Sequence, residues 1–466
     1  MPSYRTPGVY VQETSTLPPS VAEVESAIPA FIGYTEKATK AAADDLRYKP
    51  TKILSFAQYQ QYFGAPDAPN ITVTRTTTSP GVIATAVVPP TVTHLLYYAV
   101  NMFFDNGGGK CYVVSVGDYD GAMDIAGLMT GLDAVALEDE PTLLVCPDAL
   151  RLSDIGYDTM AQAMLNQCGS LKNRFAILDL FGGSAPKASA DLLADRARVG
   201  NKNLKYGALY FPDLQSSFNH YVKPDESNVL VSLDGGVLAT LHELAGAVKA
   251  GAHSSAYDSV KDALLNQFVV VPPSGAVAGV YAAVDSARGV WKAPANVRVA
   301  SVVKPMVVLN DAHQEDLSLD LITGKSINAL RAFADKGTLV WGARTLAGND
   351  PDWRYVPVRR FFNMVEESVK KSSLWAVFEP NDANTWGKVR GMIENYLTQK
   401  WRDGALAGAK TNEAFFVRCG LGDTMTAQDI LEGRMNVEIG MAPIRAAEFI
   451  ILQFSHEMQK PREYFE

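Results

Sequence analysis

The chain has 466 residues, of which 47% are hydrophobic and 20% are charged. This composition is ordinary for a globular protein, and the length predicts two or three domains rather than one core. The net charge of −9 disfavours a nucleic-acid-binding protein, because phosphate contacts need clustered lysine and arginine. No apolar run reaches the roughly 18 residues of a membrane span, and the first residues lack the pattern of a signal peptide. We therefore expect assembly in the cytoplasm, with no nucleic-acid partner and no direct membrane insertion.

Residues 1–25 have the composition of an extended linker arm. Val9, Tyr10 and Val11 form a strand barely long enough to pair, and prolines flank it at Pro7 and at Pro18–Pro19. Such a segment buries too little surface to fold by itself. Composition leaves two outcomes open: the arm is disordered, or it adds as an edge strand to another molecule.

Residues 26–350 alternate apolar strands with helical stretches, which predicts an α/β domain with a largely parallel sheet. Two less regular segments, near 65–92 and 212–266, interrupt this pattern, and we expect them to be insertions that face outward. The expected strands are Ala27–Tyr34, Lys110–Val116, Thr142–Cys146, Phe175–Leu180 and Leu204–Phe211, and the expected helices are Ser55–Phe63, Thr93–Phe104, Met160–Gly169 and Ala190–Val199.

Residues 351–457 predict a C-terminal α+β domain, followed by a charged tail at 458–466. One helix is expected from Pro357, a favourable first-turn residue, and a second from about Asn384 to Arg402, each with one apolar stripe at helical spacing. These two helices are expected on one face of a sheet. The expected strands are Ser373–Phe378, Ala414–Cys419, Met435–Met441 and Glu448–Phe454.

Motifs for catalysis and cofactor binding are incomplete in this sequence. Gly324-Lys325-Ser326 mimics the end of a phosphate-binding loop but lacks the earlier glycine. His242-Glu243 begins like a zinc protease, yet the position of the second histidine ligand is Gly246. We therefore predict no catalytic residue, no metal site and no cofactor. The four cysteines are widely spaced and are expected to be reduced core residues: Cys111, Cys146, Cys168 and Cys419.

Several stretches of the sequence carry a resemblance to one known family. In the C-terminal part they follow in the order DPDWRYVPVRRFFNMVEESVKKSSLWAVFEPNDANTWGKVRGMIENYL, AFFVRCG and GRMNVEIGMAPIRAAEFIILQF. This succession resembles the C-terminal domain of contractile tail sheath proteins, which form the contracting sleeve of myophage tails, R-type tailocins and extracellular contractile injection systems. Near the N-terminus, PGVYVQE and AIPAFIGYTEKA are similar to the opening of the same family.

The resemblance implies a fold and a mode of assembly. The α/β domain of this family is described as subtilisin-like in architecture, and arms from neighbouring subunits complete the sheet of the C-terminal domain. The partners implied are further copies of the chain or sheath isoforms, an inner tube protein, and baseplate and tail terminator proteins. The residues expected in this strand exchange are Val9, Tyr10, Val11, Phe449, Ile450, Ile451 and Leu452.

The helix at 384–402 is the candidate for contact with the inner tube, because in the family such a helix lines the lumen. At 100° per residue, Lys388 and Arg402 fall nearly opposite the apolar stripe, and Arg390 and Lys400 flank it, where long side chains snorkel or pair with a neighbour. We predict Lys388 and Arg402 as tube-binding residues, with Arg390 and Lys400 as weaker members. A merely solvated helix face stays open as the alternative.

The sequence thus favours a structural protein: a subunit of a contractile sheath, metastable when extended, whose contraction drives a tube through a target membrane. A non-contractile filament or shell protein would use the same strand exchange. A subtilisin-like hydrolase is the third hypothesis, and it rests on fold analogy alone.

Overall fold

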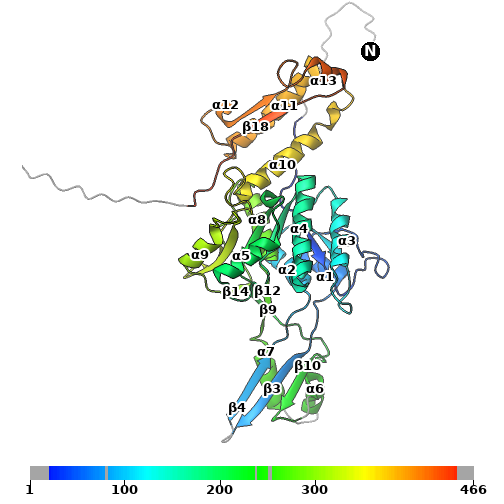
Figure 1. The fold of residues 1–466 in the computed structure, drawn as a ribbon. Helices are drawn as coiled ribbons and strands as arrows, with labels where there is room; N and C mark the ends of the chain where they lie inside the picture. The colour runs from blue at the N-terminus through cyan, green and yellow to red at the C-terminus, as the bar shows by residue number, and fades with distance from the viewer. Residues whose placement is uncertain (1–19, 79–81, 237–238, 250–253, 449–466) are drawn as a thin grey trace, which may run out of the picture.

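The computed structural model describes residues 20–78, 82–236, 239–249 and 254–448. Figure 1 shows three parts stacked along one long axis, with a large α/β layer in the middle. The C-terminal helices lie at one end of this layer and a small α/β unit lies at the other. None of the helices in the described ranges combines the length and the apolar character of a membrane span.

The middle layer is built on a nine-stranded sheet, in the order β13-β16-β15-β8-β7-β6-β1-β5-β2. The six strands from β15 to β5 are parallel, and β2, β16 and β13 pair antiparallel at the two ends. This confirms the prediction of a largely parallel sheet with buried apolar strands. The bounds are β1 Pro29–Gly33, β2 Thr51–Ile53, β5 Cys111–Ser115, β6 Leu143–Val145, β7 Phe175–Asp179, β8 Gly207–Phe211, β13 Val297–Arg298, β15 Ile327–Phe333 and β16 Gly337–Val340.

Helices cover both faces of this sheet and give it two apolar cores. One face carries α1 Phe56–Phe63, α2 Leu96–Asp105 and α8 Ser274–Arg288. The other carries α3 Ile125–Ala136, α4 Asp154–Leu171, α5 Ser189–Arg198 and α9 Asp311–Ser318. All four cysteines are buried and free, as predicted.

Beside the nine-stranded sheet lies a three-stranded sheet, which pairs β12 Phe268–Val271, β9 Leu214–Asn219 and β14 Val302–Pro305. Short 3-10 turns lie at Pro147–Arg151 and Leu204–Tyr206.

The two segments that interrupt the α/β pattern join into one small unit. Strand β3 pairs in parallel with β10, from a segment more than 150 residues later in the chain, so that Ile71 lies beside Val229. A hairpin alone is marginal in water, and each segment buries its apolar face only against the other. The unit contains β3 Ile71–Thr78, β4 Val82–Val88, β10 Val229–Leu233, β11 Ala239–Thr240, α6 Leu241–Lys249 and α7 Ser254–Leu264.

The C-terminal part packs two long helices and a small sheet around its own core. The predicted helices and two of the predicted strands are confirmed: α10 Val356–Ser372, α11 Ala383–Arg402, β17 Phe415–Arg418 and β18 Glu438–Met441, with β17 antiparallel to β18. Short helices α12 Thr411–Ala414 and α13 Ala427–Leu431 lie between them. The predicted strand beginning at Glu448 falls outside the described residues after that position.

The predicted buried strand at Ser373–Phe378 is wrong. Residues Leu374–Ala376 form a 3-10 turn directly after α10, and Leu374, Val377 and Phe378 are 65%, 57% and 103% exposed. The run follows α10 without a break in helical backbone, and most of its apolar side chains face solvent instead of a core. The apolar run is therefore a connection between helices, and only Trp375 and Ala376 pack against the core.

Candidate assembly interface

Helix α11 forms as its periodicity predicted. Asp382 caps its first turn by accepting hydrogen bonds from the amides of Asn384 and Thr385 at 3.0 Å. Val389, Ile393 and Leu397 are buried on the inner face. The two tryptophans at its ends are half-buried, and each donates its indole N–H: Trp386 to Asn381 and Trp401 to the carbonyl of Gly408.

The outer face of α11 is polar and cationic. Lys388, Arg390 and Arg402 are exposed. Arg390 lies 3.9 Å from Glu394, and within the described part of the chain neither Lys388 nor Arg402 has an ion pair. Gly391 lies between the two cations on the same stripe, and a Cβ placed there would meet no atom within 4 Å. The face is therefore open to close approach by another molecule.

Lys400 is placed differently from the other three predicted cations. It is 8% exposed, and its ammonium lies 2.5 Å from Glu23 and 3.3 Å from Asp403. Its Nζ also lies 5.3 Å from the centre of the Trp291 ring. Helical periodicity placed Lys400 beside the apolar stripe, where its side chain would either snorkel or pair with a neighbouring residue. In the structure it pairs with Glu23 and Asp403. Lys400 holds the chain's own N-terminal segment and does not present its charge outward.

The segment Ser20–Ile28, here called the N-terminal strap, runs along both C-terminal helices. Two serines of α10 accept its backbone amides: Ser372 from Ala22 and Ser368 from Val24, each at 3.0 Å. Glu23 accepts the Tyr396 hydroxyl at 3.2 Å in addition to its ion pair with Lys400. These contacts thus hold the strap against both C-terminal helices.

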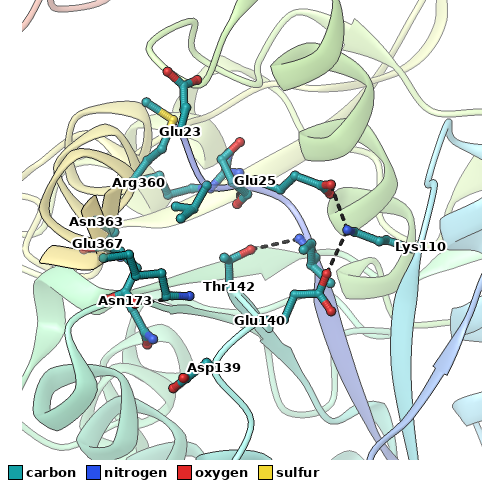
Figure 2. Close-up of a pocket in the computed structure, with 15 residues that line it drawn as sticks. Glu23, Glu25, Lys110, Asp139, Glu140, Thr142, Asn173, Arg360, Asn363 and Glu367 are labelled. Carbon is teal, nitrogen blue, oxygen red and sulfur yellow. Dashed lines mark hydrogen bonds and ion pairs between the residues drawn. The ribbon is translucent and has the colours of Figure 1, made fainter. Parts of the chain in front are cut away.

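The same strap joins the C-terminal helices to the α/β layer across a cleft of about 250 Å³ (Figure 2). Glu25 pairs with Lys110 at 2.7 Å, and Lys110 also pairs with Glu140 at 2.8 Å. Glu140 accepts further bonds from Lys52 and from the Tyr112 hydroxyl. The bonds from Lys110, Lys52 and Tyr112 lower the pKa of Glu140 to about 2. Glu140 therefore remains charged at neutral pH.

A buried ion pair fixes α10 to the layer at the same place. The Arg360 guanidinium contacts both carboxylate oxygens of Asp285, at 2.5 and 3.1 Å, and also donates to the carbonyl of Ser26. Arg360 and Asp285 side chains are 2% and 7% exposed. The α/β layer, the strap and α10 therefore meet at one rigid junction.

The residues predicted for strand exchange lie outside the described ranges: Val9, Tyr10, Val11, Phe449, Ile450, Ile451 and Leu452. Glu448, the last described residue, is held by Arg344 through contacts of 2.9 and 2.5 Å. The sheet of the C-terminal part contains only β17 and β18 in the described residues.

The sequence predicted neither the strap contacts nor the Arg344–Glu448 pair, because the residues that pair lie far apart in the chain.

The lysine of the incomplete phosphate-loop motif, Lys325, is 2% exposed and donates to the carbonyl of Arg196 at 2.7 Å. The described residues contain no cluster of three or more histidine, cysteine or acidic side chains that could hold a metal ion.

Comparison with known proteins identifies relatives along the whole chain. Residues 348–456 match the family model of the phage tail sheath C-terminal domain. A chain of the contracted helical sheath of the anti-feeding prophage is 32% identical, with 98% of this chain and 100% of that one covered and a TM-score of 0.64. A chain of the anti-feeding prophage baseplate is 31% identical, with coverage of 98% and 100% and a TM-score of 0.66.

Phage proteins give shorter matches. The tail sheath protein of Vibrio phage KVP40 is 28% identical over 155 residues, which are 33% of this chain and 22% of that protein. The tail sheath protein of Enterobacteria phage T4 is 27% identical over 150 residues, 32% of this chain and 21% of that protein. The matched region thus spans only about a fifth of these curated relatives. Because the anti-feeding prophage chains match along their entire length, this chain belongs to the contractile tail sheath family.

Proposed function

We propose that the chain is the structural subunit of a contractile sheath around the inner tube of a phage-tail-like injection machine. In this proposal, subunits assemble in the cytoplasm into an extended, metastable helical polymer, and contraction drives the tube through a target membrane. The observation that carries it is the match over 98% of the chain to a sheath solved in its contracted state. The particle, a phage tail or an extracellular contractile particle, is then released from the cell.

Strand exchange is the proposed means of linking subunits. In the described residues the sheet of the C-terminal part has only the two strands β17 and β18, so strands from neighbouring arms would extend it. Each added strand would contribute several backbone hydrogen bonds at roughly 1 kcal/mol net apiece. The strap and the Arg344–Glu448 pair support this proposal, because they hold in place the described residues next to each proposed arm.

Tube binding is proposed for Lys388 and Arg402, with Arg390 as a weaker member. Their exposure and the open space at Gly391 support a polar contact at short range. Contraction must break this contact, and charge pairs at an exposed interface are weak and sensitive to salt. Lys400 is left out of this set, because it is engaged by Glu23.

The remaining partners are proposed from the same family membership. Baseplate association is supported by the match to a chain in a baseplate assembly. A tail terminator would close the other end of the polymer. No enzymatic role, nucleic-acid partner or membrane insertion is proposed, and the subtilisin-like description of the α/β layer stays a prediction about architecture.

Negative-stain electron microscopy of the purified chain tests the proposal directly. The expected result is hollow tubes formed by the chain alone, or together with the inner tube protein if a nucleus is needed. Co-assembly with the inner tube protein should also yield sheath polymers of two lengths and diameters, one extended and one contracted. Tubes of one fixed length and diameter would instead indicate a static filament, and monomers under every condition would contradict the proposal.

A further inference from the structure

One turn in the middle layer displays aliphatic side chains to solvent. It follows α9, and we call residues Leu319–Ile322 the apolar turn. Leu321 and Ile322 are 93% and 79% exposed, and Leu319 is 45% exposed. Single exposed aliphatic residues are ordinary on protein surfaces, but a group of them marks an interaction site.

Hydrogen bonds hold the backbone of the apolar turn in place. The Asp320 carboxylate accepts the amides of Ile322 and Thr323 at 3.1 and 3.0 Å. The Asp320 carbonyl accepts Gly324 and the side chain of Asn349. A backbone held in one conformation loses little entropy on binding. The turn is therefore preorganised to contact a partner.

Two buried cations brace this turn, which explains the incomplete phosphate-loop motif. The Arg196 guanidinium donates to the carbonyls of Lys325 and Leu317 at 2.9 and 3.1 Å. In return, the Lys325 ammonium donates to the carbonyl of Arg196. Buried charges are costly unless fully paired. Arg196 and Lys325 therefore fix the backbone that carries the exposed aliphatic side chains of the apolar turn.

The apolar turn lies where the chain departs toward its C-terminal arm. Arg344, which holds Glu448, also donates to the carbonyl of Ser318 at 3.2 Å, the residue before the turn. Residues 449–466 follow Glu448. If these residues exchange strands with another subunit, that subunit lies off the α9 side of the layer. The neighbouring partner of the apolar turn is then a second copy of this chain.

An open helical polymer needs two different surfaces that match each other, because a contact between identical surfaces closes into a dimer. Figure 1 shows α9 at one side of the middle layer and α1 and α3 at the other. On that opposite side, at the β2 end of the sheet, residues 36–54 expose Leu54 to 65% and Tyr48 to 38%. Both sides thus carry exposed apolar groups.

The charges of the two sides are complementary. Residues 305–324 contain four carboxylates and no lysine or arginine, and Glu315 and Asp316 of α9 are exposed. Residues 36–54 contain five lysines and arginines against three carboxylates, and Lys37 and Lys49 are exposed. Such complementarity fixes the register of two surfaces and disfavours a contact between two like surfaces.

We propose that the apolar turn and the acidic face of α9 dock onto the 36–54 flank of the next copy. This forms a head-to-tail contact between α/β layers in addition to strand exchange. The inference rests on the proposed function, since it assumes a polymer of this chain. The contact joins rigid parts of two subunits, whereas the arms join them through extended segments.

The first test removes the aliphatic tip with Leu321→Ser and Ile322→Ser in one full-length chain. The expected result is a critical concentration for tube formation raised by about tenfold or more, the effect of weakening one interface, with an unchanged melting temperature of the unassembled subunit. The control is Leu265→Ser, another exposed aliphatic residue at 64%, which should leave the critical concentration unchanged. Normal tube formation by the double serine variant overturns the inference while the proposed function stands.

The second test identifies the surface that receives the turn. Glu315→Lys with Asp316→Lys should raise the critical concentration, and so should Lys37→Glu with Lys49→Glu. All four changes in one chain should restore it to within about threefold of the unmodified chain, because the charges again match across the contact. Failure to restore overturns the assignment of the 36–54 flank. If the unmodified chain forms no polymer even with its inner tube and baseplate, the proposed function fails, and this inference fails with it.

Discussion

The N-terminal and C-terminal ends of the parallel strands carry carboxylates in opposite electrostatic states. At the edge where the parallel strands begin, Glu140 is bonded by Lys110, Lys52 and Tyr112, which lower its pKa to about 2. At the edge where they end, Asp179 is buried, and burial raises its pKa to about 7. The same chemical group is thus readily ionised at one edge and resists ionisation at the other.

The difference follows from what each carboxylate joins. Glu140 and Asp285 lie at the junction of the layer with the strap and α10, where cations from distant segments converge. Asp179 instead accepts the amide of Ser274 at 2.7 Å, at the start of α8, and Asp148 accepts the amides of Tyr34 and Leu95. Backbone amides at a helix start favour a negative charge, but here they do not offset the burial. At the junction, ion pairs connect different parts of the molecule, whereas Asp179 and Asp148 bind backbone amides within the layer.

Breaking the buried pair at the junction should have the largest effect on stability. Arg360→Met leaves Asp285 buried without its cation, which typically costs about 3–5 kcal/mol. The expected result is a clear fall in the denaturant midpoint, measured by circular dichroism on the unassembled chain. Arg331→Met is the matched control, because its partner Asp311 is 98% exposed and such a pair contributes about 0–1 kcal/mol. Equal effects of the two substitutions would contradict a structural role for the junction.

Neutralising the buried carboxylate at the opposite edge should stabilise the chain at pH 8. The folded-state pKa of Asp179, about 7, lies above its ordinary value of 3.8. The folded state therefore binds the proton more tightly, and stability falls as pH rises from about 4 to about 7. Asp179→Asn should be more stable than the unmodified chain by about 1–3 kcal/mol at pH 8, with the advantage shrinking toward pH 5.

Denaturation midpoints at pH 5, 6.5 and 8 measure this trend. Asp213→Asn should behave similarly, since burial raises the Asp213 pKa to about 6. Asp335→Asn, at an exposed turn, is the control. An Asp179→Asn variant less stable than the unmodified chain at pH 8 would show that the charged form is needed to hold the start of α8.

Deleting residues 1–20 tests assembly rather than stability. The strap contacts begin at Ala22, so the deletion leaves the junction intact and the folded subunit should melt within a few degrees of the full chain. Tube formation should be lost, because one proposed exchange strand is removed. Sedimentation and electron microscopy measure this, and normal tubes from the truncated chain would rule out exchange by the N-terminal arm.

Reversing the charges on α11 should have a smaller and more selective effect. Lys388→Glu with Arg402→Glu is expected to weaken co-sedimentation with the inner tube several-fold at low salt, and little at high salt, because exposed charges are screened. Polymers of the chain alone should be unaffected. The control reverses two exposed lysines elsewhere, Lys202→Glu with Lys336→Glu. Unchanged co-sedimentation would leave α11 with a merely solvated outer face.

The sequence predicted what depends on local pattern and missed what depends on distant partners. The spacing of Val389, Ile393 and Leu397 was enough to place α11 and its outer face. Nothing local shows that β3 pairs with β10, so the two insertions were expected to be separate. The same limit applies to Lys400, whose partner Glu23 lies in a segment with no regular structure. The wrong strand at Ser373–Phe378 arose because an apolar run was assumed to be buried, although three of its side chains face solvent.

The smallest effect on stability is expected at the exposed end of the junction. Glu140 is 34% exposed and Lys52 is 41% exposed, so water weakens their pairing, and Glu140→Gln should cost about 0.5–1 kcal/mol at pH 7. Because its folded-state pKa of about 2 lies below the ordinary 4.5, this contribution is present above pH 4.5 and is lost as pH falls toward 2. The unmodified chain and the Glu140→Gln variant should therefore converge in denaturant midpoint at low pH and separate at neutral pH. A difference that persists at pH 2 would mean that Glu140 acts through packing rather than through charge.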